Sequence, residues 1–217
     1  MVLYGTSFLV PVSTKAKGEV PGLDERRGRI VQAAAGLFMN RGFAGTSTQD
    51  IATAAKVSKR ELYTLFESKQ DILVACITHR IAQINVTVTL PVVSDRASLA
   101  RALDVFGANV LRWLSKPSTI ALYRLAVVEA KQAPEIARAL DSAGRVPLRG
   151  ALTAWLTAAQ NGRLIGDGDP DRMAEQFFSL LLGELRLRLV LGVVAHPDEN
   201  EILRRAGAAT EAFLRLH

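Results

Sequence analysis

Residues 47–71 read STQDIATAAKVSKRELYTLFESKQD, and in this stretch a serine stands three residues before an acid three times. The pairs are Ser47 with Asp50, Ser58 with Glu61, and Ser68 with Asp71. Each pair is a capping box, in which the serine hydroxyl accepts a hydrogen bond from a backbone N–H and the acid accepts one in return. Three helix starts this close together allow only short helices with tight turns, which predicts a helix-turn-helix unit.

A longer helix is predicted before this unit, capped by Asp24 and ended by Gly42 in a left-handed conformation. Phe43 is expected to fold back on its last turn. Its apolar face follows the spacing of helical turns and comprises Ile30, Ala33, Ala34, Leu37 and Phe38. This face provides the surface on which the short helices can pack.

The short helices should complete a small core. The second is expected to bury Ile51 and Ala54, and the third to bury Leu62, with Phe66 closing the core. The fourth is expected to be long, with one apolar face made of Ile72, Leu73, Cys76, Ile77, Ile81 and Ile84.

The third helix then turns a polar face outward, carrying Lys59, Arg60 and Thr64. A helix fits the major groove of DNA, where arginine and lysine pair with guanine edges. The start of the second helix directs backbone N–H groups outward, which suits a phosphate. Candidate contacts around it are Thr46, Ser47, Thr48, Ser58, Tyr63 and Lys69. The alternative is a set of solvated charges on an ordinary bundle, but the spacing of caps and apolar residues favours DNA.

The rest of the chain also predicts helices, because alanine, leucine and arginine dominate it. Helices are expected at 97–114, 118–132, 134–143, 146–161, 170–193 and 198–216. We therefore expect an all-α protein. Its parts are a flexible arm over residues 1–23, a helix-turn-helix DNA-binding domain over 24–70, and a second helical domain over 71–217.

Composition narrows the class of protein. The 217 residues carry a formal net charge of +6, which is compatible with nucleic acid. Cys76 is the only cysteine, so the chain has no internal disulfide and fits a reducing compartment. Cys76 lies on an apolar face of its predicted helix, which favours a thiol packed in the core. No apolar run approaches the roughly 18 residues of a membrane span, and a signal peptide is missing. A cytoplasmic protein without a membrane partner is expected.

No metal, cofactor or catalytic site is expected. Asp167, Asp169 and Asp171 alternate like the start of a calcium loop, but Arg172 and Phe178 replace the required glycine and glutamate. Asp169 is expected to cap the following helix instead. The three histidines lack ligand spacing, and no phosphate loop or nucleophile motif appears. An enzyme would need a cluster of catalytic side chains that we do not find.

Residues 26–77 resemble the DNA-binding domain of the TetR family of bacterial regulators. The matching residues are Ile30, Ala34, Leu37-Phe38, Gly42-Phe43, Thr46-Ser47, Asp50-Ile51-Ala52, Val57-Ser58, Leu62-Tyr63, Phe66, Ser68-Lys69 and Leu73. The resemblance implies a homodimeric transcription regulator with a C-terminal domain for dimerisation and effector binding. We expect a repressor released by a small apolar ligand. By this resemblance the third helix and Gln49 would read bases, while Thr46, Ser47, Tyr63 and Lys69 would hold phosphates.

Two positions depart from the family pattern. Lys56 occupies the turn position where the family usually has glycine, so a positive φ there would cost about 1 kcal/mol. Glu61 replaces a small residue and either holds the helix cap or accepts a hydrogen bond from cytosine. Operator preference is therefore not transferable from relatives.

Residues 122–130 and 134–137 resemble the C-terminal domain of AcrR-type members, which often control efflux pumps. Bundle sites form between facing helices, and the candidate pocket residues are Phe106, Val110, Trp113, Tyr123, Glu129, Trp155 and Phe177. The alternative for each of the large apolar residues is plain core, which is the commoner role of a single residue of this kind. Glu129 and Glu184 interrupt apolar faces and are candidates to orient a ligand. The alternative is that each carboxylate is solvated or ion-paired.

The last two predicted helices are rich in apolar residues that suit a dimeric four-helix bundle. These are Phe177, Leu180, Leu181, Leu185, Leu189, Ile202, Leu203, Ala206, Ala209 and Phe213. The alternative is internal core, and the family resemblance favours the dimer. A structural DNA-binding protein without an effector site is the main rival function, and it would have a closed C-terminal core.

Overall fold

The computed structural model describes residues 23–84, 90–131 and 133–217, and its regular structure over these ranges is helical, without a strand. The expected all-α class is confirmed. The predicted arm lies outside the described residues except for Leu23, which begins the first helix. In the described ranges no helix combines the length and hydropathy needed to span a membrane.

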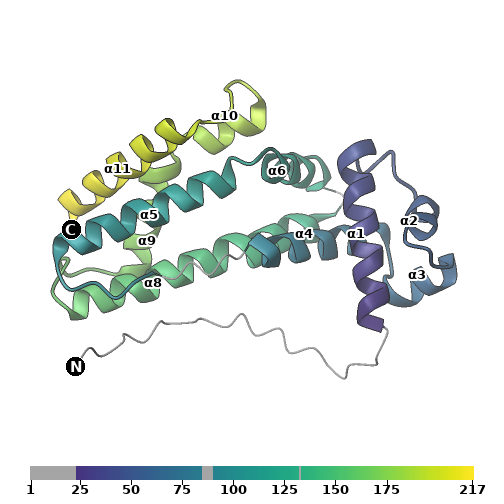
Figure 1. Cartoon of the computed structure of the whole chain (residues 1–217), viewed down its shortest axis with the longest axis horizontal. Helices are drawn as coiled ribbons and strands as arrows, with labels where there is room; N and C mark the ends of the chain where they lie inside the picture. The colour runs from purple at the N-terminus through teal and green to yellow at the C-terminus, as the bar shows by residue number, and fades with distance from the viewer. Residues whose placement is uncertain (1–22, 85–89, 132) are drawn as a thin grey trace. The chain divides into compact units, whose positions relative to one another are not determined.

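The described helices form two compact units, of which the N-terminal unit comprises residues 23–84 and Ala121–Gly144. Its helices are α1 (Leu23–Arg41), α2 (Thr48–Ala54), α3 (Lys59–Leu65), α4 (Lys69–Ile84), the end of α6 (Pro117–Glu129) and α7 (Pro134–Leu140). α1 packs on α2 and α4, and α2 packs on α3, as Figure 1 shows. α4 also packs against α7. By packing, α4 therefore groups with the helix-turn-helix, whereas the sequence predicted a boundary between residues 70 and 71.

The core of this unit is largely the predicted one. Residues without any exposed surface are Ile30, Ala34, Ile51, Ala52, Leu62, Ile72, Ile77, Ala133 and Ile136. Gly42 ends α1 with φ of 75°, and the ring centroids of Phe38 and Phe43 lie 5.3 Å apart. The Cys76 thiol donates to Val31 O at 3.3 Å, and burial raises its pKa to about 12. The left-handed cap, the folded-back Phe43 and the packed thiol are all confirmed.

Two details of this core differ from the prediction. α1 begins at Leu23, so Asp24 lies inside the helix and not at its cap position. Ala54 is exposed, whereas Ala52 and Ala55 are buried beside Ile51. A seven-residue helix has only a narrow buried face. The packing of α2 on α1 determines which alanines lie on that face.

The C-terminal unit comprises residues 90–120 and Arg145–His217. Its helices are α5 (Arg96–Leu114), the start of α6, α8 (Val146–Asn161), α9 (Pro170–Leu182), α10 (Leu185–Leu191) and α11 (Glu199–Leu216). A π-helical turn, Asp141–Arg145, precedes α8 at the point in the chain where the two units are divided. α5 and α11 run side by side in Figure 1, and α9 packs on α11 and α8. A β-carbon at Gly107 of α5 would meet Leu181 Cδ1 at 3.1 Å and Ala206 Cβ at 3.4 Å. The absence of a side chain there permits this close packing of three helices.

The single helix predicted at 170–193 is wrong, because the chain breaks between α9 and α10. Gly183 has φ of 43° and ψ of −128°, a conformation that residues with a β-carbon avoid. The apolar pattern continues across the break, so periodicity alone could not reveal it.

Most of the predicted dimer face is internal core, the alternative considered above. The buried members are Phe177, Leu181, Leu185, Leu189, Ile202, Ala206, Ala209 and Phe213. Leu180 and Leu203 are exposed, as are Leu187, Leu191 and Leu216. Of the predicted set, only Leu180 and Leu203 keep exposed surface for a second copy of the chain.

Candidate nucleic-acid interface

The first two capping boxes have the predicted geometry. Ser47 N donates to Asp50 Oδ2 at 3.0 Å, and Asp50 N donates to Ser47 Oγ at 3.1 Å. Ser58 N donates to Glu61 Oε2 at 2.8 Å, and Glu61 N donates to Ser58 Oγ at 3.1 Å. Hydrogen bonds from the two serines lower the pKa values of both carboxyls. Glu61 is thus held at the cap, the first of its two predicted roles.

The start of α4 is fixed in a related way. Ser68 Oγ accepts a hydrogen bond from Asp71 N at 3.0 Å, which is one of the two hydrogen bonds of the predicted third capping box. Capping hydrogen bonds therefore fix the residues at which α2, α3 and α4 begin.

The outer face of α3 presents the predicted polar side chains. Lys59, Arg60 and Thr64 are exposed, while Leu62 on the opposite side is fully buried. Tyr63 is 46% exposed, and its hydroxyl lies 3.1 Å from Thr48 Oγ1 of α2. The hydroxyls of two helices therefore meet beside the cationic face.

The side chains around the start of α2 differ in their exposure to solvent. Ser47 and Gln49 are exposed, and Thr48 is half-buried. Thr46 is only 1% exposed, and its hydroxyl donates to Gly42 O at 2.8 Å. Because its side chain is buried and hydrogen-bonded within the loop, its predicted phosphate contact is not supported. Thr46 instead holds the loop that leads into α2.

Lys69 also braces this loop. Its Nζ donates to Phe43 O at 2.9 Å and Thr46 O at 3.0 Å, and it lies 4.2 Å from the centroid of the Phe43 ring. An ammonium group has three donors, so one remains beyond these two bonds. The predicted phosphate contact of Lys69 stays a prediction.

The turn between α2 and α3 contains the backbone strain expected from the sequence. Lys56 is exposed and has φ of 55°, the left-handed region. Val57 N donates to Ala52 O at 3.0 Å, which closes the turn around this residue.

Two arginines of α1 that the sequence reading passed over contact α3. Arg27 Nη1 donates to Leu65 O at 3.2 Å, and Arg26 Nη1 lies 3.7 Å from Glu61 Oε1. The only signal in the sequence was the group of three arginines just before Ile30.

The predicted effector-pocket residues are divided between the two units. Phe106 and Phe177 lie with ring centroids 6.0 Å apart in the buried cluster of the C-terminal unit, and Val110 is also buried. The indole of Trp155 donates to Pro91 O at 2.8 Å. Tyr123 and Glu129 belong to the N-terminal unit. Trp113 Nε1 is buried without a hydrogen-bond partner among the described residues. The pocket itself stays a prediction.

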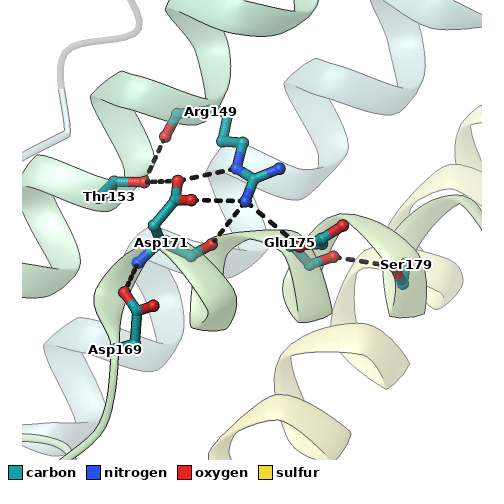
Figure 2. A network of polar contacts seen from close by, with 6 residues as sticks. All are labelled: Arg149, Thr153, Asp169, Asp171, Glu175 and Ser179. Carbon is teal, nitrogen blue, oxygen red and sulfur yellow. Dashed lines mark hydrogen bonds and ion pairs between the residues drawn. The ribbon is translucent and has the colours of Figure 1, made fainter.

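A polar network that the sequence did not predict joins α8 to α9 (Figure 2). Arg149 Nε donates to Asp171 Oδ1 at 2.8 Å, and its Nη2 donates to Asp171 Oδ2 at 2.6 Å and Glu175 Oε2 at 3.3 Å. Thr153 Oγ1 donates to the same carboxylate at 3.3 Å. The hydrogen bonds from Arg149 are the main cause of the lowered pKa of Asp171.

Asp169 has the capping role that the sequence predicted. Asp169 Oδ1 accepts from Asp171 N at 3.0 Å and caps α9. Across the part of the chain that the structure describes, no group of His, Cys, Asp or Glu side chains could hold a metal ion.

Comparison with protein families gives two matches. Residues 30–76 match the family described as "Bacterial regulatory proteins, tetR family", and residues 101–216 match "AefR-like transcriptional repressor, C-terminal domain". The second match covers more than half of the chain and names an AefR-like domain, where the sequence resemblance was to AcrR-type members.

Individual relatives agree with this assignment. The chain is similar to the HTH-type transcriptional activator FasR of Mycolicibacterium smegmatis, with 34% identity over 33% of this chain, and it spans 32% of that curated relative. The solved structure of the flavonoid-responsive regulator FrrA has a TM-score of 0.76 and 30% identity over 89% of this chain and 97% of that chain. A putative TetR-family regulator from Mesorhizobium loti has a TM-score of 0.80 and 24% identity, covering 91% and 98% of the two chains.

Proposed function

Because this chain belongs to the tetR family of bacterial regulatory proteins, we propose that α3 reads the base edges of an operator and that a small effector controls this binding. The chain is a DNA-binding transcription regulator. The observation that carries the specific assignment is the exposed face of α3. Lys59, Arg60 and Thr64 project from a helix whose start is fixed by a capping box.

The proposed contacts fall into two classes. Lys59, Arg60, Thr64 and Gln49 read bases in the major groove, because these side chains are exposed and of the types that pair with base edges. The phosphate contacts come from Ser47, Thr48, Ser58, Tyr63 and Lys69, together with the N–H groups at the start of α2. Thr46 is omitted because it is buried.

We place a second copy of the chain against the outer surface of α9 and α11. Regulators of this family act as dimers. A groove of about 310 Å³ on this surface is lined by Leu180, Leu181, Arg204, Arg205, Ala208 and Ala209. Exposed leucine beside small alanine allows two helices to approach closely, which supports a helix-on-helix interface.

The proposed effector is a small, largely apolar molecule that releases the protein from DNA. The relative FrrA is named as flavonoid-responsive, and the matched C-terminal domain is described as that of a repressor. The name of FrrA supports an aromatic effector, and the description of the matched domain supports a repressor. The cytoplasmic location predicted from the sequence stays a prediction.

The test is selection of bound sequences from random duplex DNA by the full-length chain. A two-fold dimer with one recognition helix per subunit should select an inverted repeat with half-sites about one DNA turn apart, or a multiple of it. Arg60→Ala should relax the choice at one position and cost about 1–3 kcal/mol of operator binding. Recovery of no motif, or of asymmetric single sites only, would contradict the proposal.

A further inference from the structure

The recognition helix α3 is attached to the rest of the N-terminal unit by few contacts. It has seven residues, and only Leu62 among them is buried. A helix this short is not stable alone in water, so its orientation depends on the groups that touch it. Phe66 follows it into the core, and Tyr63 meets Thr48 of α2.

Arg27 of α1 adds a contact at the C-terminal end of α3. Its Nη1 donates to Leu65 O at 3.2 Å, and its guanidinium carbon lies 4.5 Å from the centroid of the buried Phe66 ring. The last carbonyls of a helix have no partner within the helix, and a cation there also complements the helix dipole. One side chain thus holds both the last residue of α3 and the residue that follows it.

The neighbouring arginines of α1 differ from Arg27. Arg26 lies 3.7 Å from Glu61, but both side chains are about half exposed, and such ion pairs contribute little. Arg29 pairs with Glu25 of its own helix at 3.4 Å. Arg29 therefore offers a matched control, because it carries the same charge on the same helix and forms its ion pair within α1.

We infer that Arg27 is a positioning residue that sets the angle of α3 on α1 and thereby the fit of the base-reading side chains in the groove. This inference rests on the proposed role of α3. Base contacts demand accurate placement, whereas phosphate contacts add affinity without sequence information. Loss of Arg27 should therefore reduce discrimination between sequences more than it reduces binding to DNA in general.

The experiment measures the affinity of the full-length chain for its selected operator and for random duplex over a range of salt concentrations. Arg27→Ala should lower the ratio of operator to random affinity by about fivefold or more, with an unchanged salt slope. Arg29→Ala should leave the ratio unchanged. Arg27→Lys keeps the charge but loses the planar group that stacks on Phe66, so its ratio should fall between those of Arg27→Ala and the unmodified chain.

Other outcomes would overturn the inference. Equal losses on both duplexes, with a salt slope flattened by about one charge, would identify Arg27 as a direct phosphate contact. A ratio unchanged in a folded Arg27→Ala variant would show that Arg27 has no positioning role. If circular dichroism shows that Arg27→Ala is unfolded, Arg27→Lys becomes the test. A ratio of operator to random affinity for Arg27→Lys equal to that of the unmodified chain would then refute the inference. Absence of any preferred duplex for the unmodified chain would instead refute the proposed function.

Discussion

At the scale of single residues, the turn between α2 and α3 holds one strained position. Lys56 has φ of 55°, where the β-carbon of an L-residue approaches the following carbonyl oxygen. Glycine adopts this conformation without that contact, although it also increases the entropy of the unfolded chain. The balance of these two effects determines how a substitution of Lys56 changes the free energy of unfolding.

Lys56→Gly should raise the free energy of unfolding by about 0.5–1 kcal/mol, because relief of the strain exceeds the added entropy of the unfolded chain. Chemical denaturation of the full chain measures this change. Lys56→Ala is the control, since it removes the charge and keeps the β-carbon. Equal stability of the two variants would show that charge and not backbone strain matters at this turn.

Residue roles were predictable from the sequence where they depend on local spacing. The capping serines, Gly42 and the strained Lys56 follow from positions a few residues apart. The roles of Thr46 and Arg27 depend on the path of a loop and on the packing of α1 against α3. No local pattern encodes such contacts, so the sequence predicted neither the burial of Thr46 nor the contact of Arg27 with α3.

At the scale of elements, the break after α9 depends on the backbone of one glycine. Gly183→Ala should lower the free energy of unfolding by about 1–3 kcal/mol, because alanine is strained at φ of 43° and ψ of −128°. A steric clash with neighbouring atoms is not the cause, since a β-carbon there would meet nothing within 4 Å. Thermal and chemical unfolding give the change.

Gly150 provides the matched control for this substitution. It lies inside α8, and a β-carbon there also meets nothing within 4 Å. Gly150→Ala should stabilise the protein by up to about 1 kcal/mol through helix propensity. If Gly183→Ala were equally stabilising, α9 and α10 would be free to join into the single helix that the apolar pattern predicts.

The network between α8 and α9 should make the stability of the C-terminal unit depend on pH. Hydrogen bonds from Arg149 lower the pKa of Asp171 below its ordinary value of 3.8. The carboxylate therefore stabilises the folded state above that value, and its contribution is lost as the pH falls through the lowered pKa. Asp171→Asn should be less stable than the unmodified chain near neutral pH, and the difference should shrink below about pH 3.8. Melting temperatures between pH 3 and 7 test this, and a constant difference would contradict it.

At the scale of the whole molecule, the sequence predicted the helical class and nearly every helix, since helix starts and apolar periods are local signals. It did not predict that residues 121–144 pack with the N-terminal helices. That grouping arises from the contact of α7 with α4, two helices about 60 residues apart in the sequence. For the same reason, Tyr123 and Glu129 fall in a different unit from Phe106 and Phe177.

The division of the chain into two units bears on how an effector would control DNA binding. Helices α6 and α7 continue the chain from one unit into the other and back. An effector that binds more tightly to a molecule whose recognition helices do not match successive major grooves will favour that form. Linkage then requires DNA to weaken effector binding by the same factor by which the effector weakens DNA binding, typically about 1–3 kcal/mol.

The measurement is titration of small apolar compounds against the preformed complex of the full chain with its selected operator. An effector should lower operator affinity about 5- to 150-fold, the range equivalent to that coupling energy. Its own affinity should fall by the same factor when operator DNA is present. Arg60→Ala serves as the control, because it should weaken operator binding while leaving effector affinity in the absence of DNA unchanged. A compound that binds the C-terminal unit tightly yet leaves operator affinity unaltered would refute effector control, and DNA binding would stand without it.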